Sequence, residues 1–418
     1  MPNTLSTERT GSRLYFPMKL FIVTKNDSML SQKGPHPMSI GLTAIKRAYK
    51  TIRSSIDATP LVSSRSLSLQ AGMPVFLKLE NLQKTGSFKV RGAFNRIAQL
   101  TTAQRRSGVV TASAGNHAQG VALAARTHGM SATIVMPEGA SIAKQEASGS
   151  YGARVILHGR DFDAAMEKAR EIERTEGRVL IHAFDDEAVI AGQGTIALEI
   201  LKDRPDVRTI LVPVGGGGIA SGIALAIKKV KPSIQVVGVT APARPTLADG
   251  IAVKSPGRIT RPLLERYLDR TIRVAEDEIA EAVLLLIEHK RIISEGAGAV
   301  PLAALLNHGR RLRGPVCLVI TGGNIDVTLL ERIIDRGLVR TGRLLRLSVV
   351  LPDRPGALAK LTSAIGQMGA NILHIVHDRL SSGLPLTQSR VDLSLETRGE
   401  EHSRKIMNHR RRNGYPLR

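Results

Sequence analysis

Short apolar runs alternate with helical stretches along this chain of 418 residues, from about residue 72 onward. Runs such as PVFLKLE, RTILVPVG and PVCLVITGG have the length and the branched apolar residues of buried strands. The stretches between them show helical periodicity, as in DFDAAMEKAREIERTEG. Strand and helix in repetition predict an α/β fold, in which helices cover both faces of an open parallel sheet.

Clusters of small residues follow three of the predicted strands, in TASAGNH, PVGGGG and TGGN. In parallel α/β folds, ligands bind at the carboxyl ends of the strands. Because all three clusters stand at such ends, we expect a binding site to be built from them.

The pattern changes after RIIDRGLVRTG, so we place a domain boundary near Thr341. The stretch behind it predicts strand, helix, strand, strand and helix, which is typical of a small α+β ferredoxin-like module over residues 342–418. Because the chain stops at GYPLR, we expect the last strand of this module to be truncated, with a sheet edge that only a partner chain would cover. Residues 38–335 are predicted to form the core, and residues 1–37 a disordered extension.

The composition narrows the classes of partner. A net charge of +23 would suit nucleic acid, but the cations are scattered, and aromatic residues make up only 3% of the chain, too few for base stacking. No apolar run reaches the length of about 18 residues that a membrane-spanning helix needs. The single cysteine, Cys317, lies in an apolar predicted strand, which favours a core position and a reducing, cytoplasmic compartment. We therefore expect neither nucleic acid nor membrane as a partner.

A run of four glycines stands between a predicted strand and a predicted helix in PVGGGGIASGIALAIKK. Backbone N–H groups of such a loop converge on a phosphate at the helix N-terminus, where the helix dipole adds to the attraction. A dinucleotide site would instead show the spacing G-x-G-x-x-G and an acidic residue at the end of the next strand, where Thr240 stands. The phosphate of a smaller cofactor is therefore favoured over a dinucleotide and over a mere tight turn.

Asn116 and His117 stand at another junction of strand and helix. Exposed amides at such a helix start could hold a carboxylate, and the side chain of Asn116 could bond a ligand hydroxyl. The alternative is that Ser113 or Asn116 only caps the helix. The pattern alone leaves both interpretations open.

Two lysines, Lys84 and Lys89, flank a small-residue turn in LQKTGSFKVRGA. Surface lysines are common, but a desolvated lysine at such a junction has a lowered pKa and is a nucleophile. Thr321 places a hydroxyl at a third strand end, in VITGGN, which is a weak signal by itself.

Four motifs, ENLQKTGSFKVRGA, SAGNHAQGVA, PVGGGGIASG and TGGN, occur in this order. Together they resemble pyridoxal-phosphate enzymes of the tryptophan-synthase-β-like fold, and most of all the threonine dehydratases (threonine ammonia-lyases). The tail, which contains VVLPDRPGALAKL and GANILHIVHDR, resembles an ACT domain, and its coupling to this core is similar to the single-ACT form of the family. The resemblance implies a two-lobed core of open parallel sheets, with a smaller lobe inserted at about residues 111–185.

The resemblance also implies a role for each motif toward the cofactor, pyridoxal 5′-phosphate. Lys89 would carry the cofactor covalently and act as the catalytic base, whereas Lys84 would be an exposed charge. The other implied cofactor contacts are Phe88 at the ring, Asn116 at the 3′ oxygen, Thr321 at the ring nitrogen, and Gly215, Gly216, Gly217, Gly218 and Ile219 around the phosphate. The carboxylate of the amino-acid substrate would be held by Ser113, Asn116 and His117.

The implied reaction removes water from L-threonine and yields 2-oxobutanoate and ammonia, and L-serine would yield pyruvate. One alternative is a serine-preferring dehydratase or racemase, but racemases of this fold use a second serine where this chain has Ala114. The other alternative is a catalytically inactive amino-acid sensor, which is favoured only by the segment VVGVTAPARPTLADGIAVK, shorter than in most of the family. Thr240 in that segment replaces an acidic residue that belongs to a divalent-cation site in some relatives, so no metal is expected.

The ACT-like module has a loop, PDRPGAL, that opens a predicted helix, and backbone N–H groups at such a start suit an amino-acid carboxylate. By resemblance, a branched-chain amino acid would be the effector, and its candidate contacts are Asp353, Gly356, Ala357 and Asn371. The alternative is that the module only mediates dimer contacts. As an assembly of the whole chain, a homodimer or homotetramer is expected.

Overall fold

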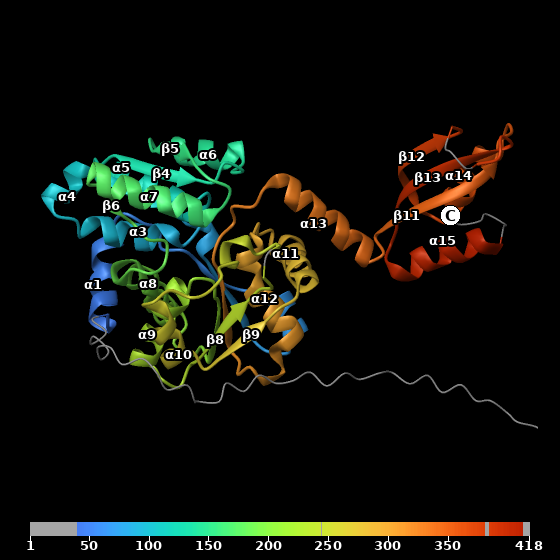
Figure 1. Cartoon of the computed structure of the whole chain (residues 1–418). Coiled ribbons are helices and arrows are strands. Elements are labelled where there is room, and N and C mark those ends of the chain that lie inside the picture. Colours follow the sequence, from blue (N-terminus) through green and yellow to red (C-terminus); the bar gives the residue numbers. More distant parts are fainter. Residues whose placement is uncertain (1–39, 244, 381–383, 413–418) are drawn as a thin grey trace, which may run out of the picture. The chain divides into compact units, whose positions relative to one another are not determined.

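The computed structural model describes residues 40–412, apart from residue 244 and residues 381–383 (Figure 1). The extension predicted for residues 1–37 therefore lies outside the described residues. Along the described chain, two lobes with parallel sheets come first and a module with an antiparallel sheet follows. This order agrees with the α/β core and the α+β module that the sequence predicts.

The larger lobe is built on a six-stranded sheet. From edge to edge its strands are β1 (Leu61–Ser63), β2 (Val75–Leu79), β10 (Val316–Ile320), β7 (Thr209–Pro213), β8 (Gln235–Thr240) and β9 (Arg270–Arg273). Every neighbouring pair is parallel except β1 and β2, which are antiparallel. The parallel arrangement confirms the prediction, and β1 is a short edge strand that the apolar pattern did not indicate.

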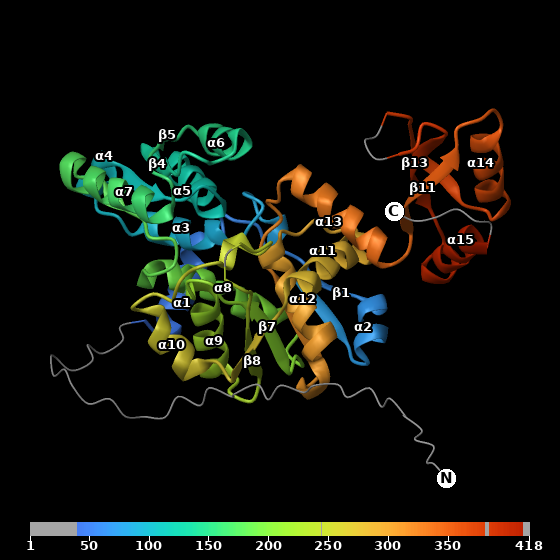
Figure 2. The same cartoon turned by 45° about the vertical axis from the view of Figure 1, so that its right-hand side comes forward.

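Helices cover both faces of this sheet (Figure 2). One face carries α1 (Leu42–Ile52), α8 (Glu187–Asp203), α9 (Gly218–Val230) and α10 (Thr260–Tyr267), and the other carries α2 (Arg65–Ala71), α11 (Glu276–Lys290), α12 (Gly296–His308) and α13 (Val327–Arg340). Each face carries its own hydrophobic core, the first under α1, α8, α9 and α10 and the second under α2, α11, α12 and α13. Successive residues of a strand point to opposite faces, so Ile210 packs in the first core and Leu211 in the second. Cys317 lies in the first core, as predicted, and burial raises the pKa of its thiol to about 12.

The smaller lobe is inserted between β2 and β7 and has a four-stranded parallel sheet. Its strands are, in order, β5 (Arg154–Leu157), β4 (Ala132–Met136), β3 (Val109–Ala112) and β6 (Val179–Leu180). The helices of this part of the chain are α3 (Lys89–Ala98), α4 (Thr102–Ser107), α5 (Asn116–Thr127), α6 (Ile142–Gly149) and α7 (Phe162–Glu176). Along the chain this sheet runs from Val109 to Leu180, and the limits of the inserted lobe at about residues 111–185 stay a prediction.

The C-terminal module has three antiparallel strands, in the order β11 (Leu344–Pro352), β13 (Gln388–Glu396) and β12 (Asn371–Asp378). Two helices, α14 (Ala357–Gln367) and α15 (Glu400–Arg412), complete it. Within the described residues no strand follows α15, and β11 pairs on one side only. The truncation of a last strand stays a prediction, because residues 413–418 lie outside the described part of the chain.

Three short 3₁₀ helices connect these elements: η1 (Glu80–Leu82), η2 (Asp249–Ile251) and η3 (Gly309–Arg311).

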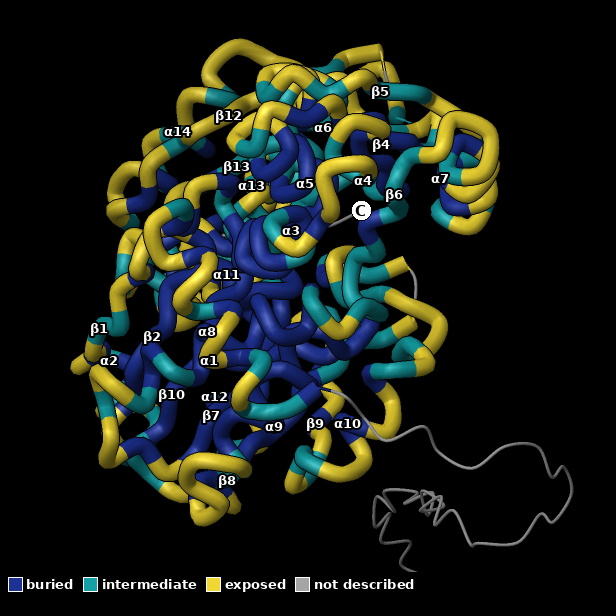
Figure 3. Tube along the Cα trace, turned by 90° about the vertical axis from the view of Figure 1, so that its left-hand side faces the viewer, coloured by how far each residue is buried: buried dark blue, intermediate teal, exposed yellow. Residues whose placement is uncertain are grey.

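The central strands β2, β7 and β10 are buried along their whole length, as the dark blue segments of Figure 3 show. None of the helices in the described ranges is long and apolar enough to cross a membrane.

A cluster of charged side chains is buried where the two lobes meet. Arg91 of α3 is fully buried and binds Glu80 of η1 at 2.7 Å and Glu199 of α8 at 2.6 Å. Lys78 of β2 also binds Glu199. Burial alone would raise the pKa of Glu80, but the adjacent Arg91 holds it below its ordinary value. Likewise, burial would lower the pKa of Arg91, and the two carboxylates raise it. The cluster joins the first helix of the smaller lobe to two elements of the larger one.

Replacing Arg91 by methionine leaves two buried carboxylates without their main partner. Breaking a buried ion pair on one side costs about 3–5 kcal/mol, so we expect Arg91→Met to lower the free energy of unfolding by that amount. Urea denaturation followed by circular dichroism measures the loss. The control is Arg126→Met, since Arg126 is exposed; equal losses in the two variants would contradict the structural role of the cluster.

Candidate active site

Lys89 is the first residue of α3, and it follows a turn that is held against the end of β10. The N–H of Phe88 donates to the carbonyl of Thr321 at 3.1 Å, and the N–H of Gly323 donates to the carbonyl of Gly86 at 2.9 Å. Gly86 has a φ of +69°, and a Cβ there would lie 2.5 Å from Oδ1 of Asn324, so the turn requires glycine. The turn thereby sets Lys89 at the carboxyl end of the central strand.

Lys89 is partly buried. Its Nζ donates to the carbonyl of Ala183 at 3.0 Å and lies 5.2 Å from the centroid of the Phe88 ring. Burial lowers the pKa of Lys89 to about 8, although the carboxyl group of Glu295 opposes this shift. Lys84, in contrast, is exposed, as predicted. Of the two lysines, only Lys89 has the environment of a nucleophile.

Asn116, the first residue of α5, lies beside the same strand end. Its Nδ2 donates to both carboxyl oxygens of Glu295, each at 2.9 Å, and its Oδ1 accepts from Nδ2 of Asn324 at 2.6 Å. The structure therefore brings together Lys89, Asn116 and Thr321 at the end of β10. Lys89 and Thr321 are 232 residues apart in the sequence. Thr321 is buried, and its carbonyl binds the Lys89 turn.

Glu295 belongs to this site, and sequence analysis missed it. Glu295 precedes α12 and is almost fully buried. Its carboxyl group lies against Gly322, since a Cβ added to Gly322 would lie 2.5 Å from Oε1 of Glu295. Burial raises the pKa of its carboxyl group to about 7, against the effect of the hydrogen bond from Asn116. The available signal was SEGAGAV, an acidic residue directly before a helix of small residues.

The four glycines form the loop between β7 and α9, and close packing explains why glycine is required. A Cβ on Gly216 would lie 2.3 Å from the ring of Phe184, and a Cβ on Gly215 would lie 2.6 Å from Cα of Ile251. Gly217 has a φ of +93°, in the left-handed region. The first N–H groups of α9 have no carbonyl partner within the helix, and they lie at its positive end. The loop is therefore a cradle that fits a phosphate.

Ser113 and His117 lie on either side of the start of α5. Oγ of Ser113 accepts from the N–H of Gly115 at 3.2 Å. The ring of His117 is buried, and its Nε2 donates to the carbonyl of Ile181 at 2.9 Å. Burial lowers the pKa of His117 to about 3, so the ring is neutral at physiological pH. The part of His117 that is free to face a ligand is its backbone N–H at the helix start.

The predicted effector residues of the C-terminal module do not form one cluster. Asp353 and Gly356 lie in the loop between β11 and α14, where Gly356 has a φ of +83° and Asp353 pairs with Arg379 at 3.1 Å. Asn371 begins β12 opposite Glu396, which pairs with the first residue of β11. Eight residues of strand, or roughly 26 Å, therefore separate Asn371 from that loop within one chain.

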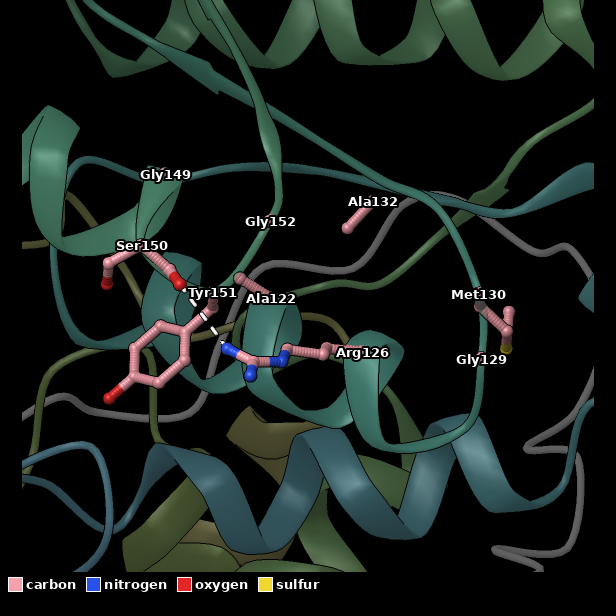
Figure 4. Close-up of a pocket in the computed structure, with 9 residues that line it drawn as sticks. All are labelled: Ala122, Arg126, Gly129, Met130, Ala132, Gly149, Ser150, Tyr151 and Gly152. Carbon is pink, nitrogen blue, oxygen red and sulfur yellow. Dashed lines mark hydrogen bonds between the residues drawn. The ribbon is translucent and has the colours of Figure 1, made fainter.

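A surface pocket on the smaller lobe lies apart from this constellation (Figure 4). None of the predicted site residues lines it; the lining residues are Ala122, Arg126, Gly129, Met130, Ala132, Gly149, Ser150, Tyr151 and Gly152. Its charged residue, Arg126, is exposed and donates to the carbonyl of Ser150 at 3.4 Å, the dashed line in Figure 4. In the described part of the chain, no three side chains of the usual metal-binding types gather around one point.

Comparison with protein families matches residues 52–322 to the family described as pyridoxal-phosphate dependent enzyme. Residues 345–401 match the ACT domain. The first match contains Lys89, Asn116, the four glycines and Thr321, and it contains Glu295 as well. The second match begins one residue after the first residue of β11.

Two curated relatives match over most of the chain, and a third matches over a shorter part. The L-threonine ammonia-lyase of Thermotoga maritima is 46% identical over 385 residues, which are 88% of this chain and 96% of the relative. The L-threonine ammonia-lyase of Geobacter sulfurreducens is 45% identical over 394 residues, which are 89% of this chain and 98% of the relative. The catabolic L-threonine dehydratase TdcB of Staphylococcus aureus is 44% identical over 72% of this chain and 94% of its own length.

Solved structures match the core. Maize serine racemase superposes with a TM-score of 0.67 and 32% identity over 72% of this chain and 99% of its own. A threonine deaminase from T.th. superposes with a TM-score of 0.66 and 38% identity over 68% of this chain and 99% of its own. The residues around Lys89 fit the cofactor of this family, because a partly buried amine with a lowered pKa and a glycine loop that fits a phosphate lie at neighbouring strand ends.

The lowered pKa of Lys89 gives the site a measurable dependence on pH. In the cofactor-free chain, reaction of Lys89 with an amine reagent should rise with a midpoint near pH 8, because only the neutral amine reacts and it predominates above the pKa. Rapid labelling with acetic anhydride, followed by peptide mass spectrometry, measures it, with the Lys84 peptide as an internal reference. Glu295→Gln should move the midpoint to lower pH, since this carboxyl group raises the pKa. A midpoint above pH 10, the range of ordinary lysines, would contradict the assignment.

Proposed function

The chain belongs to the family of pyridoxal-phosphate-dependent enzymes, and from this premise we propose that it deaminates L-threonine to 2-oxobutanoate and ammonia. The observation that carries the proposal is the match to two L-threonine ammonia-lyases over nearly their full length, core and C-terminal module together. L-Serine, which differs by one methyl group, is proposed as a second substrate that yields pyruvate.

Lys89 is proposed to hold the cofactor and then to move the α-proton. Pyridoxal phosphate supplies an electron sink that makes the α-proton of a bound amino acid acidic. A Lys89 amine with a pKa of about 8 is neutral in a sizeable fraction at physiological pH, so its Nζ accepts this proton once the substrate amine has replaced it. The ring of Phe88 and the glycine loop, with Ile219 behind it, would hold the cofactor at its ring and its phosphate.

The remaining polar groups are proposed to orient the substrate and the cofactor ring. The backbone N–H groups at the start of α5, from Asn116 and His117, together with Oγ of Ser113, would bind the substrate carboxylate. The amide of Asn116 would bond the 3′ oxygen, and Glu295 fixes the orientation of this amide. Thr321 would face the ring nitrogen with a neutral hydroxyl, which need not keep that nitrogen protonated.

The racemase alternative is supported by the likeness to maize serine racemase, but the side chain at position 114 argues against it. Racemisation needs a proton donor on the second face of the α-carbon, and Ala114 has no group that carries a proton. We therefore propose a lyase that releases ammonia and does not form the D-amino acid.

The ACT domain is proposed to bind a branched-chain amino acid and so to regulate the enzyme, with the loop of Asp353, Gly356 and Ala357 as the contact region. Asn371 would join this site only from a second chain, because it lies at the other end of its own sheet. We propose a homodimer or homotetramer in the cytoplasm. The open side of β11, which has no partner strand in the described residues, supports such an assembly.

Replacing Lys89 by alanine tests the catalytic assignment. We expect turnover of L-threonine to fall by at least about 10³-fold, because the variant lacks both the covalent anchor and the base, and the absorbance of the lysine-bound cofactor to disappear. Keto-acid release and the visible spectrum measure the two effects. Lys84→Ala is the matched control and should change neither, since Lys84 is exposed. Turnover that survives in Lys89→Ala would overturn the assignment, and wild-type protein without keto-acid release would favour the inactive sensor.

Regulation is tested by adding isoleucine or valine during turnover of L-threonine. We expect a change in the rate that saturates with the added amino acid and that is lost in Gly356→Val, because a branched side chain is strained at a φ of +83° at the start of α14. The control is Gly366→Ala, at a position where a Cβ meets open space. A rate that neither amino acid alters at saturation would leave the ACT domain with a role in assembly alone.

A further inference from the structure

The segment that leads from the smaller lobe back to the larger one, residues 181–186, contacts both ends of the active site. Its Ala183 carbonyl accepts from Nζ of Lys89. The ring of Phe184 packs against Gly216 of the glycine loop, and the Cβ and backbone of Phe184 pack against Gly218. We call it the return segment. The residue after Phe184, Asp185, is half-buried, and its carboxylate binds a different part of the larger lobe.

The carboxylate of Asp185 accepts three backbone N–H groups from the residues before and at the start of α10. The donors are Ile259 at 2.7 Å, Arg258 at 3.0 Å and Thr260 at 3.3 Å. A Cβ on Gly257 would lie 2.2 Å from the same carboxylate, so the turn at residues 257–260 is closely wrapped around Asp185. A carboxylate with three N–H donors has a fixed position, and it fixes the turn in return.

The turn at residues 257–260 in turn binds the glycine loop through Thr260, which is fully buried. Oγ1 of Thr260 donates to the carbonyl of Gly216 at 2.6 Å and accepts from the N–H of Gly257 at 2.8 Å. The N–H of Gly257 also donates to the carbonyl of Gly216 at 3.3 Å. The carbonyl of Gly216 therefore has two donors, both from a turn that Asp185 holds.

Fixing this carbonyl also fixes the direction of an N–H group that can bind phosphate. The peptide unit is planar and trans, so the N–H of Gly217 points away from the carbonyl of Gly216 and hence away from Thr260. Glycine has the largest conformational freedom of all residues, and a loop of four glycines has no side chains that could hold its peptide units. The orientation of the loop must then come from its neighbours.

We propose that Asp185 and Thr260 are positioning residues for the phosphate cradle: Asp185 holds the turn at residues 257–260, and Thr260 holds the Gly216 carbonyl so that the loop N–H groups face the cofactor phosphate. Both would act through the loop and not through direct contact with the cofactor. The inference rests on the cofactor of the family and is independent of which amino acid is the substrate. The competing interpretation is that Asp185 only caps α10 and supports the fold.

Binding to the cofactor-free protein separates the two interpretations. Dissociation constants are measured by titration with pyridoxal phosphate and with pyridoxal, which has the same ring and aldehyde but no phosphate. We expect Asp185→Ala and Thr260→Val each to weaken the binding of pyridoxal phosphate by about 10- to 100-fold, which is the effect of losing hydrogen bonds at a charged site. The dissociation constant for pyridoxal should change by less than about two-fold.

Two further variants complete the test. Thr260→Ser keeps the hydroxyl and should restore the affinity for pyridoxal phosphate to within a few-fold of the wild type. Asp161→Ala is the control: Asp161 is an exposed carboxylate outside the return segment, and it caps α7 by accepting from the N–H of Ala164 at 3.0 Å. It should lower stability and leave both dissociation constants unchanged.

If Asp185→Ala weakens the binding of pyridoxal and of pyridoxal phosphate by the same factor, the proposal is overturned in favour of a purely structural cap. An unchanged affinity for pyridoxal phosphate in Thr260→Val would overturn it as well. Because the titrations contain no amino acid, their outcome is separate from the test of L-threonine as substrate.

Discussion

The buried ion cluster around Arg91 is the contact on which the active site depends. Arg91 follows Lys89 by two residues on α3, and its guanidinium group is held by carboxylates of η1 and α8. Buried charges tolerate little displacement, because each one that loses its partner carries the full desolvation penalty. The helix that presents Lys89 is therefore fixed to the larger lobe, while the turn before it is hydrogen-bonded to the end of β10.

The site that results is made of strand ends from two sheets. The end of β10 contributes Thr321, whose carbonyl accepts from the lysine turn, and Gly323, whose N–H donates to it; β7 contributes the glycine loop, and β3 leads into α5 with Asn116. The return segment at residues 181–186 links the lysine to the glycine loop. The pKa values of Lys89 and Glu295 shift in opposite directions, to about 8 and about 7, because the same desolvated surroundings disfavour the charged form of each group.

Much of the fold and of the site could be predicted, because the relevant signals are local. A strand, a run of glycines and a helix predict a phosphate-binding loop within a few residues, and the alternation of strands and helices predicts the parallel sheets. Glu295 was missed, since its partner Asn116 is 179 residues away and a single acidic residue before a helix is common. Asn371 was grouped with Asp353 by motif, whereas the register of β12 against β13 separates them within one chain.

The sequence by itself determined which local elements form and which residues stand at their junctions, because periodicity, glycine runs and caps act over short distances. Only the tertiary structure decided which junctions meet and which groups orient them. Asp185 reaches a turn that lies 75 residues further along the chain, and Thr260 reaches back 44 residues to the glycine loop. Such contacts leave no periodic trace, since one hydrogen bond between distant segments constrains only the two residues that make it.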